Sequence, residues 1–435
     1  MKVRPAQRIR GQFTPSGDKS ISHRGAMIAA LAKGASKLSN FSPGYDCATT
    51  VSCLRQLGIR IAATKDSQIV TGSGIRGFTE SSSLLDCGNS GSTIRMIAGL
   101  LAGQTFVSQL TGDDSLKSRP MRRIIEPLEL MGAKIESIDG KPPLRIFPGS
   151  PLTPIRYELP VASAQVKSAI LFAGLYANGN TSVVEHASTR DHTERMLAWF
   201  GCAIQITPQE KGAVEISLAD QKNLLARDVV IPGDISSAAF MIAVAALLPG
   251  SELTIHGVGL NPTRTQFLSQ LKSFGAKITI SEVVEVSNEP VGVIQVRGGL
   301  DSPDPAETVR IDDNTIGQLI DELPLLAVIG TQLPGGIEIR GAAELRVKES
   351  DRIASTVANL RAMGADVEDY PDGLRVDGPT RLKGARLDSH GDHRIALAFS
   401  IAALIAEGES EIAGPECVGI SFPGFFELLE SLVVR

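Results

Sequence analysis

Residues 17–34 read GDKSISHRGAMIAALAKG, and the second half of this stretch has the pattern of a buried helix. Apolar side chains stand among alanines over residues 27–31, and Gly34 ends the run in the way that glycine commonly ends helices. The first half is different, because it carries cationic and hydroxyl side chains between Lys19 and Arg24. A buried helix that begins with so many polar groups needs an explanation.

The same pattern, an apolar run closed by a glycine, recurs along the chain at intervals of about 70 residues or slightly more. The closing glycines are Gly34, Gly103, Gly179, Gly250, Gly335 and Gly408. A second series interleaves with the first, at Gly58, Gly132, Gly201, Gly275 and Gly364. Both series lengthen at the same place, which indicates an insertion within residues 276–320. Self-similarity of this kind is typical of repeated structural units, and it divides the chain into six copies.

Each copy reads as two helices alternating with short strands, so the expected fold class is α/β (α+β) with six repeated βαβαββ-type units. The last copy is short, because after FPGFFELLESLVVR the chain ends with a helix and no strands. The N-terminal segment is strand-like with no helix before it, so we expect it to supply strands to the last unit. The expected domains, with three units each and a double crossover hinge, are residues 15–230, and residues 231–435 plus 1–14.

Composition excludes several classes of protein. A chain of 435 residues suggests two or more domains. Its net charge of −5 and its 4% aromatic content argue against a nucleic-acid-binding protein, and its apolar runs are too short to span a membrane. The N-terminus lacks the apolar run of a signal peptide, and the five cysteines are scattered. We therefore expect reduced thiols and a cytoplasmic location, with no nucleic-acid or membrane partner.

Cationic residues gather at the expected helix starts. They are Lys19, Arg24, Arg95, Lys117, Arg119, Lys167, Arg190, Lys348, Arg352 and Arg394. Helix N-termini carry unpaired N–H groups and a partial positive charge, so they bind anions. A single lysine or arginine at such a place is usually exposed to solvent, but its repetition in an acidic protein favours a cleft for a small ligand with several negative charges.

Two carboxylates are placed differently from the other acidic residues. Asp321 lies in an otherwise apolar helix, and Glu349 lies between cations, so both are candidate acids or bases. Asp321 has the alternative interpretation of a helix cap or half of a buried ion pair. The HGDH segment, with His390, Asp392 and His393, raises the question of a metal site. It has no cysteine and no second cluster, so we expect no metal.

Eight motifs, in this order, resemble those of the 5-enolpyruvylshikimate-3-phosphate synthase family: GDKSISHR, GNSGSTIR, KSRPMRR, ASAQVKSA, STRDHTE, IDELP, RVKESDR and GDHRIALAF. The resemblance covers residues 17–427. It implies the two-domain enolpyruvyl transferase fold. It also implies transfer of the enolpyruvyl group of phosphoenolpyruvate to the 5-hydroxyl of shikimate 3-phosphate, with release of phosphate. That reaction belongs to the shikimate pathway of aromatic amino-acid biosynthesis. We expect a monomer without cofactor or metal.

The resemblance also implies the site residues. The catalytic residues are Asp321 as the base at the 5-hydroxyl, Glu349 as the proton donor to the methylene carbon, and Lys19 and Lys348 beside them. Shikimate 3-phosphate is expected to contact Lys19, Ser20, Arg24, Ser163, Ala164, Gln165, Arg190, Asp321 and Lys348. Phosphoenolpyruvate is expected to contact Lys19, Asn89, Gly91, Arg119, Gln165, Arg352 and Arg394. Neither the residue pattern nor the resemblance assigns a role to His23.

Some positions depart from the common family pattern. Ser92 stands where threonine is common, and Met96 where proline is common. Ile420 stands where many members have a lysine on phosphoenolpyruvate, so we expect one cationic contact fewer. The motifs are similar to those of the branch called class II, whose glyphosate-tolerant members have alanine at the position of Gly91. Glycine has no Cβ to intrude on an inhibitor longer than phosphoenolpyruvate, so we expect glyphosate to compete here.

Two further interpretations remain at this point. UDP-N-acetylglucosamine enolpyruvyl transferase shares the fold and the donor, but it carries a loop cysteine that has no counterpart here, and it lacks the KSISHR and ASAQVKSA pair. A non-catalytic anion-binding scaffold would explain the cations. Asp321 and Glu349 argue against a scaffold, because carboxylates in a cationic cleft weaken anion binding.

Overall fold

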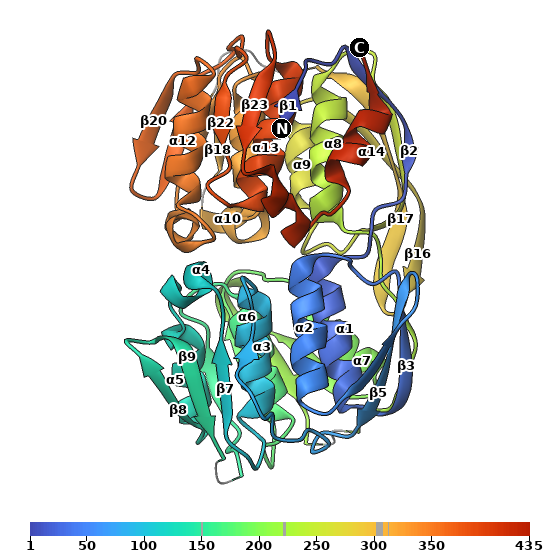
Figure 1. The fold of residues 1–435 in the computed structure, drawn as a ribbon, viewed down its shortest axis with the longest axis vertical. Helices are drawn as coiled ribbons and strands as arrows, with labels where there is room; N and C mark the ends of the chain where they lie inside the picture. Colours follow the sequence, from blue (N-terminus) through green and yellow to red (C-terminus); the bar gives the residue numbers. More distant parts are fainter. Residues whose placement is uncertain (149–150, 221–222, 302–307, 312) are drawn as a thin grey trace. The chain divides into compact units, whose positions relative to one another are not determined.

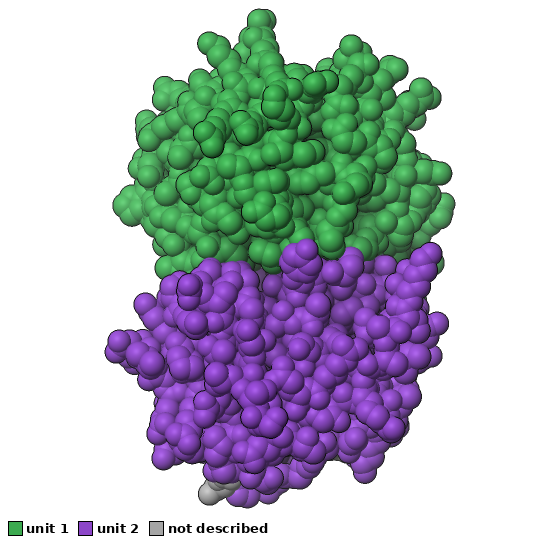
Figure 2. Space-filling view, in the orientation of Figure 1, with its two compact units in different colours: residues 1–16, 232–285, 290–435 green, residues 17–231, 286–289 purple. Residues whose placement is uncertain are grey.

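The computed structural model of the chain describes residues 1–148, 151–220, 223–301, 308–311 and 313–435 (Figure 1). The chain forms two compact units, which Figure 2 shows in different colours. Unit 1 contains residues 1–16, 232–285 and 290–435, and unit 2 contains residues 17–231 and 286–289. Within the described ranges, none of the helices has both the length and the apolar character that crossing a membrane requires.

The sheets of unit 2 share one plan over its described residues. A leading strand pairs parallel with a second strand, which pairs antiparallel with one arm of a hairpin. In this order, the three sheets are β14 (Val229–Val230), β3 (Lys33–Ser39), β5 (Ser67–Ser73) and β4 (Arg60–Ala63); β6 (Leu85–Asp86), β7 (Ser108–Thr111), β9 (Lys141–Phe147) and β8 (Lys134–Ile138); and β10 (Arg156–Glu158), β11 (Thr181–Glu185), β13 (Val214–Leu218) and β12 (Ile204–Pro208).

Three helices form the centre of unit 2 and lie side by side: α1 (Lys19–Leu31), α3 (Gly91–Leu101) and α6 (Ala164–Gly174) (Figure 1). Their apolar residues are almost completely buried, and polar and cationic residues are concentrated near the helix starts. Helices α3 and α6 approach closely because Gly99 has no side chain: a Cβ there would lie 2.3 Å from the carbonyl oxygen of Ala169. The other helices of unit 2 are α2 (Tyr45–Gln56), α4 (Asp114–Ser118), α5 (Arg122–Leu130), α7 (His192–Trp199) and the 3-10 turn η1 (Glu210–Gly212).

Unit 1 repeats the plan in its described residues. Its sheets are β2 (Arg8–Phe13), β15 (Glu252–Gly259), β17 (Glu289–Leu300) and β16 (Ala276–Val286); β18 (Val309–Ile311), β19 (Ile337–Ile339), β21 (Gly373–Val376) and β20 (Val367–Tyr370); and β22 (Arg386–Asp388), β23 (Ser410–Ala413) and β1 (Lys2–Val3). Its helices are α8 (Ile235–Leu247), α9 (Gln266–Ser273), α10 (Asp313–Leu319), α11 (Leu323–Gly330), α12 (Arg352–Ala362), α13 (His393–Ile405) and α14 (Phe425–Leu432), with 3-10 turns η2 (Ala343–Val347) and η3 (Pro415–Ile420).

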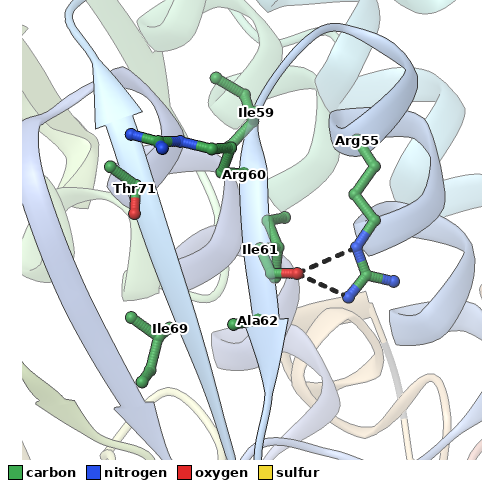
Figure 3. A pocket seen from close by; sticks show the side chains of 7 residues that line it. All are labelled: Arg55, Ile59, Arg60, Ile61, Ala62, Ile69 and Thr71. Carbon is green, nitrogen blue, oxygen red and sulfur yellow. Dashed lines mark hydrogen bonds between the residues drawn. The ribbon is translucent and has the colours of Figure 1, made fainter.

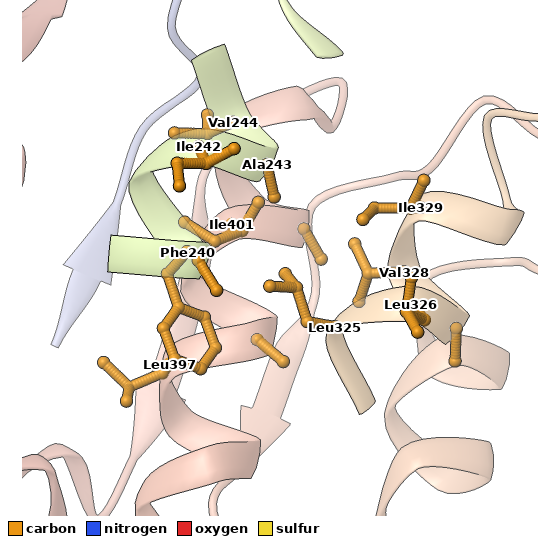
Figure 4. Close-up of a cluster of buried hydrophobic side chains, with 14 of the residues drawn as sticks. Phe240, Ile242, Ala243, Val244, Leu325, Leu326, Val328, Ile329, Leu397 and Ile401 are labelled. Carbon is orange, nitrogen blue, oxygen red and sulfur yellow. The ribbon is translucent and has the colours of Figure 1, made fainter. Parts of the chain in front are cut away.

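The core of unit 1 lies between α8, α11 and α13. Figure 4 shows side chains of the three helices meeting there, among them Phe240, Leu325 and Leu397. Each of these side chains is at most 1% exposed. Burying one such side chain stabilises the fold by about 1.5–3 kcal/mol. Helices α8, α11 and α13 supply the buried core of unit 1 as α1, α3 and α6 supply that of unit 2.

The strand pairing agrees with the predicted sixfold repeat. The expectation that the N-terminal segment supplies its strands to the last unit is wrong for β2, which joins the sheet of β15, and right only for β1. Strand β1 completes the last sheet beside β23, while β2 runs parallel to β15 and β14 runs parallel to β3. The segments that cross between the units therefore supply leading strands. The expectation that no strand follows the last helix is wrong, because β24 (Val433–Val434) pairs with β2.

The expected insertion coincides with the long hairpin of β16 and β17, which are 11 and 12 residues long. Part of the 276–320 range in which it was expected, residues 302–307 and 312, lies outside the described residues.

Candidate active site

Helix α1 begins with a cap and an ion pair. The carboxylate of Asp18 accepts a hydrogen bond from the backbone N–H of Ile21 at 2.9 Å, which satisfies one of the free donors at the helix start. The next residue, Lys19, forms an ion pair with Asp46 of α2, and both side chains are mostly buried. The pairing holds the ammonium of Lys19 in place at the start of α1.

Arg24 lies one turn further along α1 and is 3% exposed. Its guanidinium donates to Thr193 Oγ1 at 2.7 Å, to Ser168 Oγ at 3.0 Å and to the backbone oxygen of Ser20 at 3.0 Å. Ser168 belongs to α6 and Thr193 to α7. Arg24 therefore joins the starts of three helices, and the hydroxyl of Ser20 receives a longer bond from Arg190 at 3.4 Å.

Helix α6 begins at Ala164, after a cap in which Ser163 Oγ accepts from the N–H of Val166 at 3.4 Å. The amide of Gln165 is bonded at both ends to α3. Its oxygen accepts from Arg95 at 2.8 Å, and its nitrogen donates to Ser92 Oγ at 3.0 Å. The predicted residues Ser163, Ala164 and Gln165 thus lie beside the start of α3.

A loop before α3 brings Asn89 and Arg119 together. The side-chain oxygen of Asn89 accepts from Arg119 Nη2 at 2.8 Å, and its nitrogen donates to Asp113 at 2.8 Å. Gly91 is the first residue of α3. A Cβ at Gly91 would lie 2.5 Å from Arg95 Nη1 and 3.4 Å from Arg119 Nη1, so this backbone stands directly against two guanidinium groups.

In unit 1 the predicted carboxylates surround one buried arginine. Arg352, at the start of α12, is 2% exposed and forms ion pairs with Asp321 at 3.3 Å, Glu349 at 2.8 Å and Asp392 at 2.8 Å. Burial alone would lower the pKa of Arg352, but the three carboxylates outweigh it and the pKa is raised. The guanidinium therefore stays charged and holds Asp321 and Glu349 around one cation.

Arg394 is held by a further carboxylate of unit 1, that of Glu322. Its Nη1 atom lies 3.5 Å from Glu322, and its guanidinium lies 5.8 Å from the centre of the Phe240 ring. Burial raises the pKa of the Glu322 carboxyl, and the charge of Arg394 opposes that rise. Lys348, which precedes Glu349, forms an ion pair with Glu344 at 3.0 Å.

The predicted site residues therefore fall into two groups. Unit 2 contains Lys19, Ser20, Arg24, Asn89, Gly91, Arg119, Ser163, Ala164, Gln165 and Arg190, and unit 1 contains Asp321, Lys348, Glu349, Arg352 and Arg394. No role as an ion-pair partner of a site cation was predicted for Asp46, Glu322 or Asp392. For Asp392 a signal was available, because an aspartate before an apolar run is a helix-cap pattern, and it accepts from the N–H of Arg394 at 2.8 Å.

Neither a metal-ligand cluster nor the pocket on β4 and β5 adds to the candidate active site. In the described part of the chain, no group of three or more histidine, cysteine, aspartate and glutamate side chains is placed to hold a metal ion. A pocket on β4 and β5, shown in Figure 3, is lined by Arg55, Ile59, Arg60, Ile61, Ala62, Ile69 and Thr71, none of which is a predicted site residue. Arg55 donates twice to the backbone oxygen of Ile61, at 3.2 and 2.8 Å, so its guanidinium is already engaged.

Comparison with known proteins identifies the family. A family model described as EPSP synthase (3-phosphoshikimate 1-carboxyvinyltransferase) matches residues 3–429. The chain is 50% identical to a 3-phosphoshikimate 1-carboxyvinyltransferase of Koribacter versatilis, over 100% of this chain and 99% of the relative. It is 45% identical to the protein of that name from Desulforamulus reducens, over the same shares. It resembles the solved EPSP synthase from Acinetobacter baumannii with a TM-score of 0.85 and 39% identity, over 100% of this chain and 98% of that one.

Proposed function

The chain belongs to the EPSP synthase (3-phosphoshikimate 1-carboxyvinyltransferase) family, and from this membership we propose that it transfers the enolpyruvyl group of phosphoenolpyruvate to the 5-hydroxyl of shikimate 3-phosphate. The reaction releases inorganic phosphate and serves the shikimate pathway of aromatic amino-acid biosynthesis. The names of the relatives favour this acceptor over UDP-N-acetylglucosamine.

The observation that supports the proposal most is the arrangement around Arg352. The reaction needs a base at the attacking hydroxyl and an acid at the methylene carbon. Asp321 and Glu349 are both within 3.3 Å of the same guanidinium. In our proposal Asp321 takes the proton of the 5-hydroxyl, and Glu349 gives a proton to C3 of phosphoenolpyruvate.

The chemistry then proceeds in two steps. The 5-oxygen forms a bond to C2 while C3 gains its proton from Glu349, which makes a tetrahedral intermediate. The bond from C2 to the phosphate oxygen then breaks, phosphate leaves with the bonding electrons, and C3 returns a proton to Glu349. No oxidant or reductant is needed, and the proton that Asp321 took from the 5-hydroxyl passes to the departing phosphate, which returns Asp321 to its ionised form.

The cationic residues bind the anionic parts of the substrates in this proposal. Shikimate 3-phosphate contacts Lys19, Ser20, Arg24, Ser163, Ala164, Gln165, Arg190, Asp321 and Lys348, with Arg190 on the phosphate. Phosphoenolpyruvate contacts Lys19, Asn89, Gly91, Arg119, Gln165, Arg352 and Arg394. Fixed cations stabilise charge that develops on the leaving phosphate, and removing one such group typically slows a reaction by about 100-fold or more. Arg24 is almost fully engaged by protein groups, so much of its part is to fix the helix starts around the ligand.

We further propose that glyphosate competes with phosphoenolpyruvate, and that the enzyme acts as a monomer in the cytoplasm. Gly91 supports the first statement, because it leaves room beside Arg119. The five cysteines support the location, because each is a thiol outside any disulfide. Light scattering of the purified enzyme would check the oligomeric state.

One assay tests the proposed function. The purified chain is incubated with phosphoenolpyruvate and either shikimate 3-phosphate or UDP-N-acetylglucosamine, and inorganic phosphate is measured. We expect rapid release with shikimate 3-phosphate and background release with the nucleotide sugar. Background release with both acceptors, from a folded protein, would refute the proposal.

A further inference from the structure

Lys167 is a cation at a helix start that the proposed reaction does not use. It lies in the first turn of α6, and its side chain is completely buried. Its Nζ atom lies 2.9 Å from Glu185 Oε2 and 2.6 Å from Glu194 Oε1. Both glutamate side chains are at least 92% buried, since their exposed fractions are 8% and 3%. A buried lysine between two buried carboxylates needs a reason, because taking three charges out of water is costly.

The two carboxylates lie at the two ends of one loop. Glu185 is the last residue of β11, and Glu194 lies in the first turn of α7. The loop between these elements, residues 186–191, contains Arg190. Lys167 therefore holds both ends of the 186–191 loop from a third element.

A second set of bonds fixes the inside of the loop. Thr189, the neighbour of Arg190, donates its hydroxyl to Glu185 Oε2 at 2.7 Å and is 7% exposed. Glu185 Oε2 thus accepts a hydrogen bond from Thr189 and forms an ion pair with Lys167. The side chain that precedes Arg190 is therefore anchored to the same carboxylate oxygen as Lys167.

The residues next to Lys167 and Glu194 are also bonded to each other. Ser168 Oγ lies 2.6 Å from Thr193 Oγ1, and Arg24 donates to both hydroxyls. Lys167 and Ser168 of α6 therefore contact Glu194 and Thr193 of α7, respectively. The result is a single connected group that joins the 186–191 loop to the two helix starts expected to contact shikimate 3-phosphate.

The charges explain why the group depends on the lysine. Burial alone would lower the pKa of Lys167, but Glu194 and Glu185 outweigh it and the pKa is raised. Burial raises the pKa of Glu194, while Lys167 acts in the opposite direction. Without the lysine, two buried carboxylates would face each other with no counter-charge, and the loop ends would move apart or take up a proton.

We propose that Lys167 is a positioning residue for shikimate 3-phosphate: it closes the 186–191 loop at both ends and thereby sets where Arg190 meets the 3-phosphate. The inference rests on the proposed function, because it uses the assignment of Arg190 to that phosphate. An ion cluster with only a stabilising role would affect the melting temperature without changing the preference for a phosphorylated ligand.

The test compares the binding of shikimate 3-phosphate with that of shikimate, by calorimetry, in the full-length protein. The variants are Lys167→Met, which keeps the length and removes the charge, and the triple variant Lys167→Met/Glu185→Gln/Glu194→Gln, which also removes the buried carboxylates. Tyr176→Phe is the matched control, because it removes a buried 2.8 Å bond to Gln104 just beyond the other end of α6. Melting temperatures are measured for all of them.

We expect Lys167→Met and the triple variant to reduce the preference for shikimate 3-phosphate over shikimate by about tenfold or more, since small misplacements of a binding group have effects of this size. Tyr176→Phe should lower the melting temperature and leave the preference unchanged. In an Arg190→Ala background, Lys167→Met should produce little further loss, because the two residues act through one contact.

Two outcomes separate the inference from its premise. If Arg190→Ala abolishes the preference but Lys167→Met and the triple variant keep it, the positioning role of Lys167 is wrong and the proposed function stands. If the wild-type protein shows no preference for the phosphorylated ligand, or Arg190→Ala does not reduce it, the assignment of Arg190 is wrong and the inference falls with it. The triple variant keeps the test decisive if Lys167→Met alone does not fold.

Discussion

The Nη1 atom of Arg352 lies 3.3 Å from the Oδ1 atom of Asp321, and both groups are largely buried in unit 1. On its other side the same guanidinium contacts Glu349, at 2.8 Å. The candidate base and the candidate acid are thus held by one charged group, which comes from a third position in the chain. Asp321 and Glu349 are separate side chains, so the role of each can be tested by its own substitution.

Asp321→Asn removes the proposed base and keeps the size of the side chain. We expect kcat to fall by about 100-fold to 10,000-fold, because general base catalysis contributes effects of this size. The Michaelis constants should change far less, since an amide still accepts hydrogen bonds. Steady-state kinetics measure both quantities. Asp369→Asn, which breaks an exposed 2.7 Å ion pair with Arg346 in the same unit, is the control and should leave kcat unchanged. An Asp321→Asn enzyme that mainly showed raised Michaelis constants would count against the role as base.

Gly91→Ala tests the space beside the arginines. The new Cβ would lie 2.5 Å from Arg95 Nη1, so the Arg95 guanidinium must shift, and it would lie 3.4 Å from Arg119 Nη1, which is an ordinary contact. We expect the inhibition constant for glyphosate to rise more than the Michaelis constant for phosphoenolpyruvate, since the inhibitor is longer than the substrate. Inhibition kinetics against phosphoenolpyruvate give both values. An unchanged inhibition constant would show that this steric argument is wrong.

His23 links stability to pH. It is fully buried in α1, and its Nδ1 atom lies 2.7 Å from Thr50 Oγ1. Burial, followed by the charges of Lys19 and Arg24, lowers its pKa well below the ordinary value. In the unfolded chain the imidazole takes up a proton below about pH 6.5, whereas the folded protein resists it. Stability should therefore fall as the pH drops below that value, by up to about 1.4 kcal/mol per pH unit.

His23→Asn keeps a polar group near Thr50 and removes the titration. The variant should lose less of its melting temperature than the wild type between pH 7.5 and pH 5.0, as measured by calorimetry. His186→Gln, at an exposed position of the same unit, provides the comparison and should behave like the wild type. If the His23→Asn and wild-type proteins lose the same melting temperature, protonation of His23 does not cause the loss of stability at low pH.

Much of the fold could be predicted because its repeat is marked by local sequence patterns, namely apolar runs and regularly spaced glycines. Glycines such as Gly58 and Gly364 follow the last turn of a helix with a positive φ that other residues rarely adopt, so their spacing is visible without any knowledge of contacts. The expectation that Gly34 ends the first helix is wrong, because α1 ends at Leu31 and Gly34 lies in β3. The two-residue strand β24 was missed, because Val433 and Val434 continue an apolar helix pattern and only the pairing with β2 makes them a strand.

The candidate site was harder to predict, because cations at helix starts look alike in a sequence. Arg24, Lys167 and Arg352 were collected with the other cations, yet each is buried against partners that are distant in the chain. Arg24 and Thr193, for example, are separated by 169 positions. Long-range pairing of this kind depends on the folded core and not on local pattern, so the sequence could mark these residues as important without distinguishing ligand contacts from supports.

Hydrogen exchange at C3 of phosphoenolpyruvate is the most direct test of the role proposed for Glu349. The wild-type protein and Glu349→Gln are each incubated with both substrates in deuterium oxide, and the C3 positions of the product and of the remaining phosphoenolpyruvate are followed by NMR. If Glu349 protonates C3 and later takes a proton back, the wild type will incorporate deuterium at C3 during turnover. Glu349→Gln will then lose incorporation and phosphate release together, while it still binds shikimate 3-phosphate. Deuterium incorporation at the wild-type rate in Glu349→Gln would contradict the account.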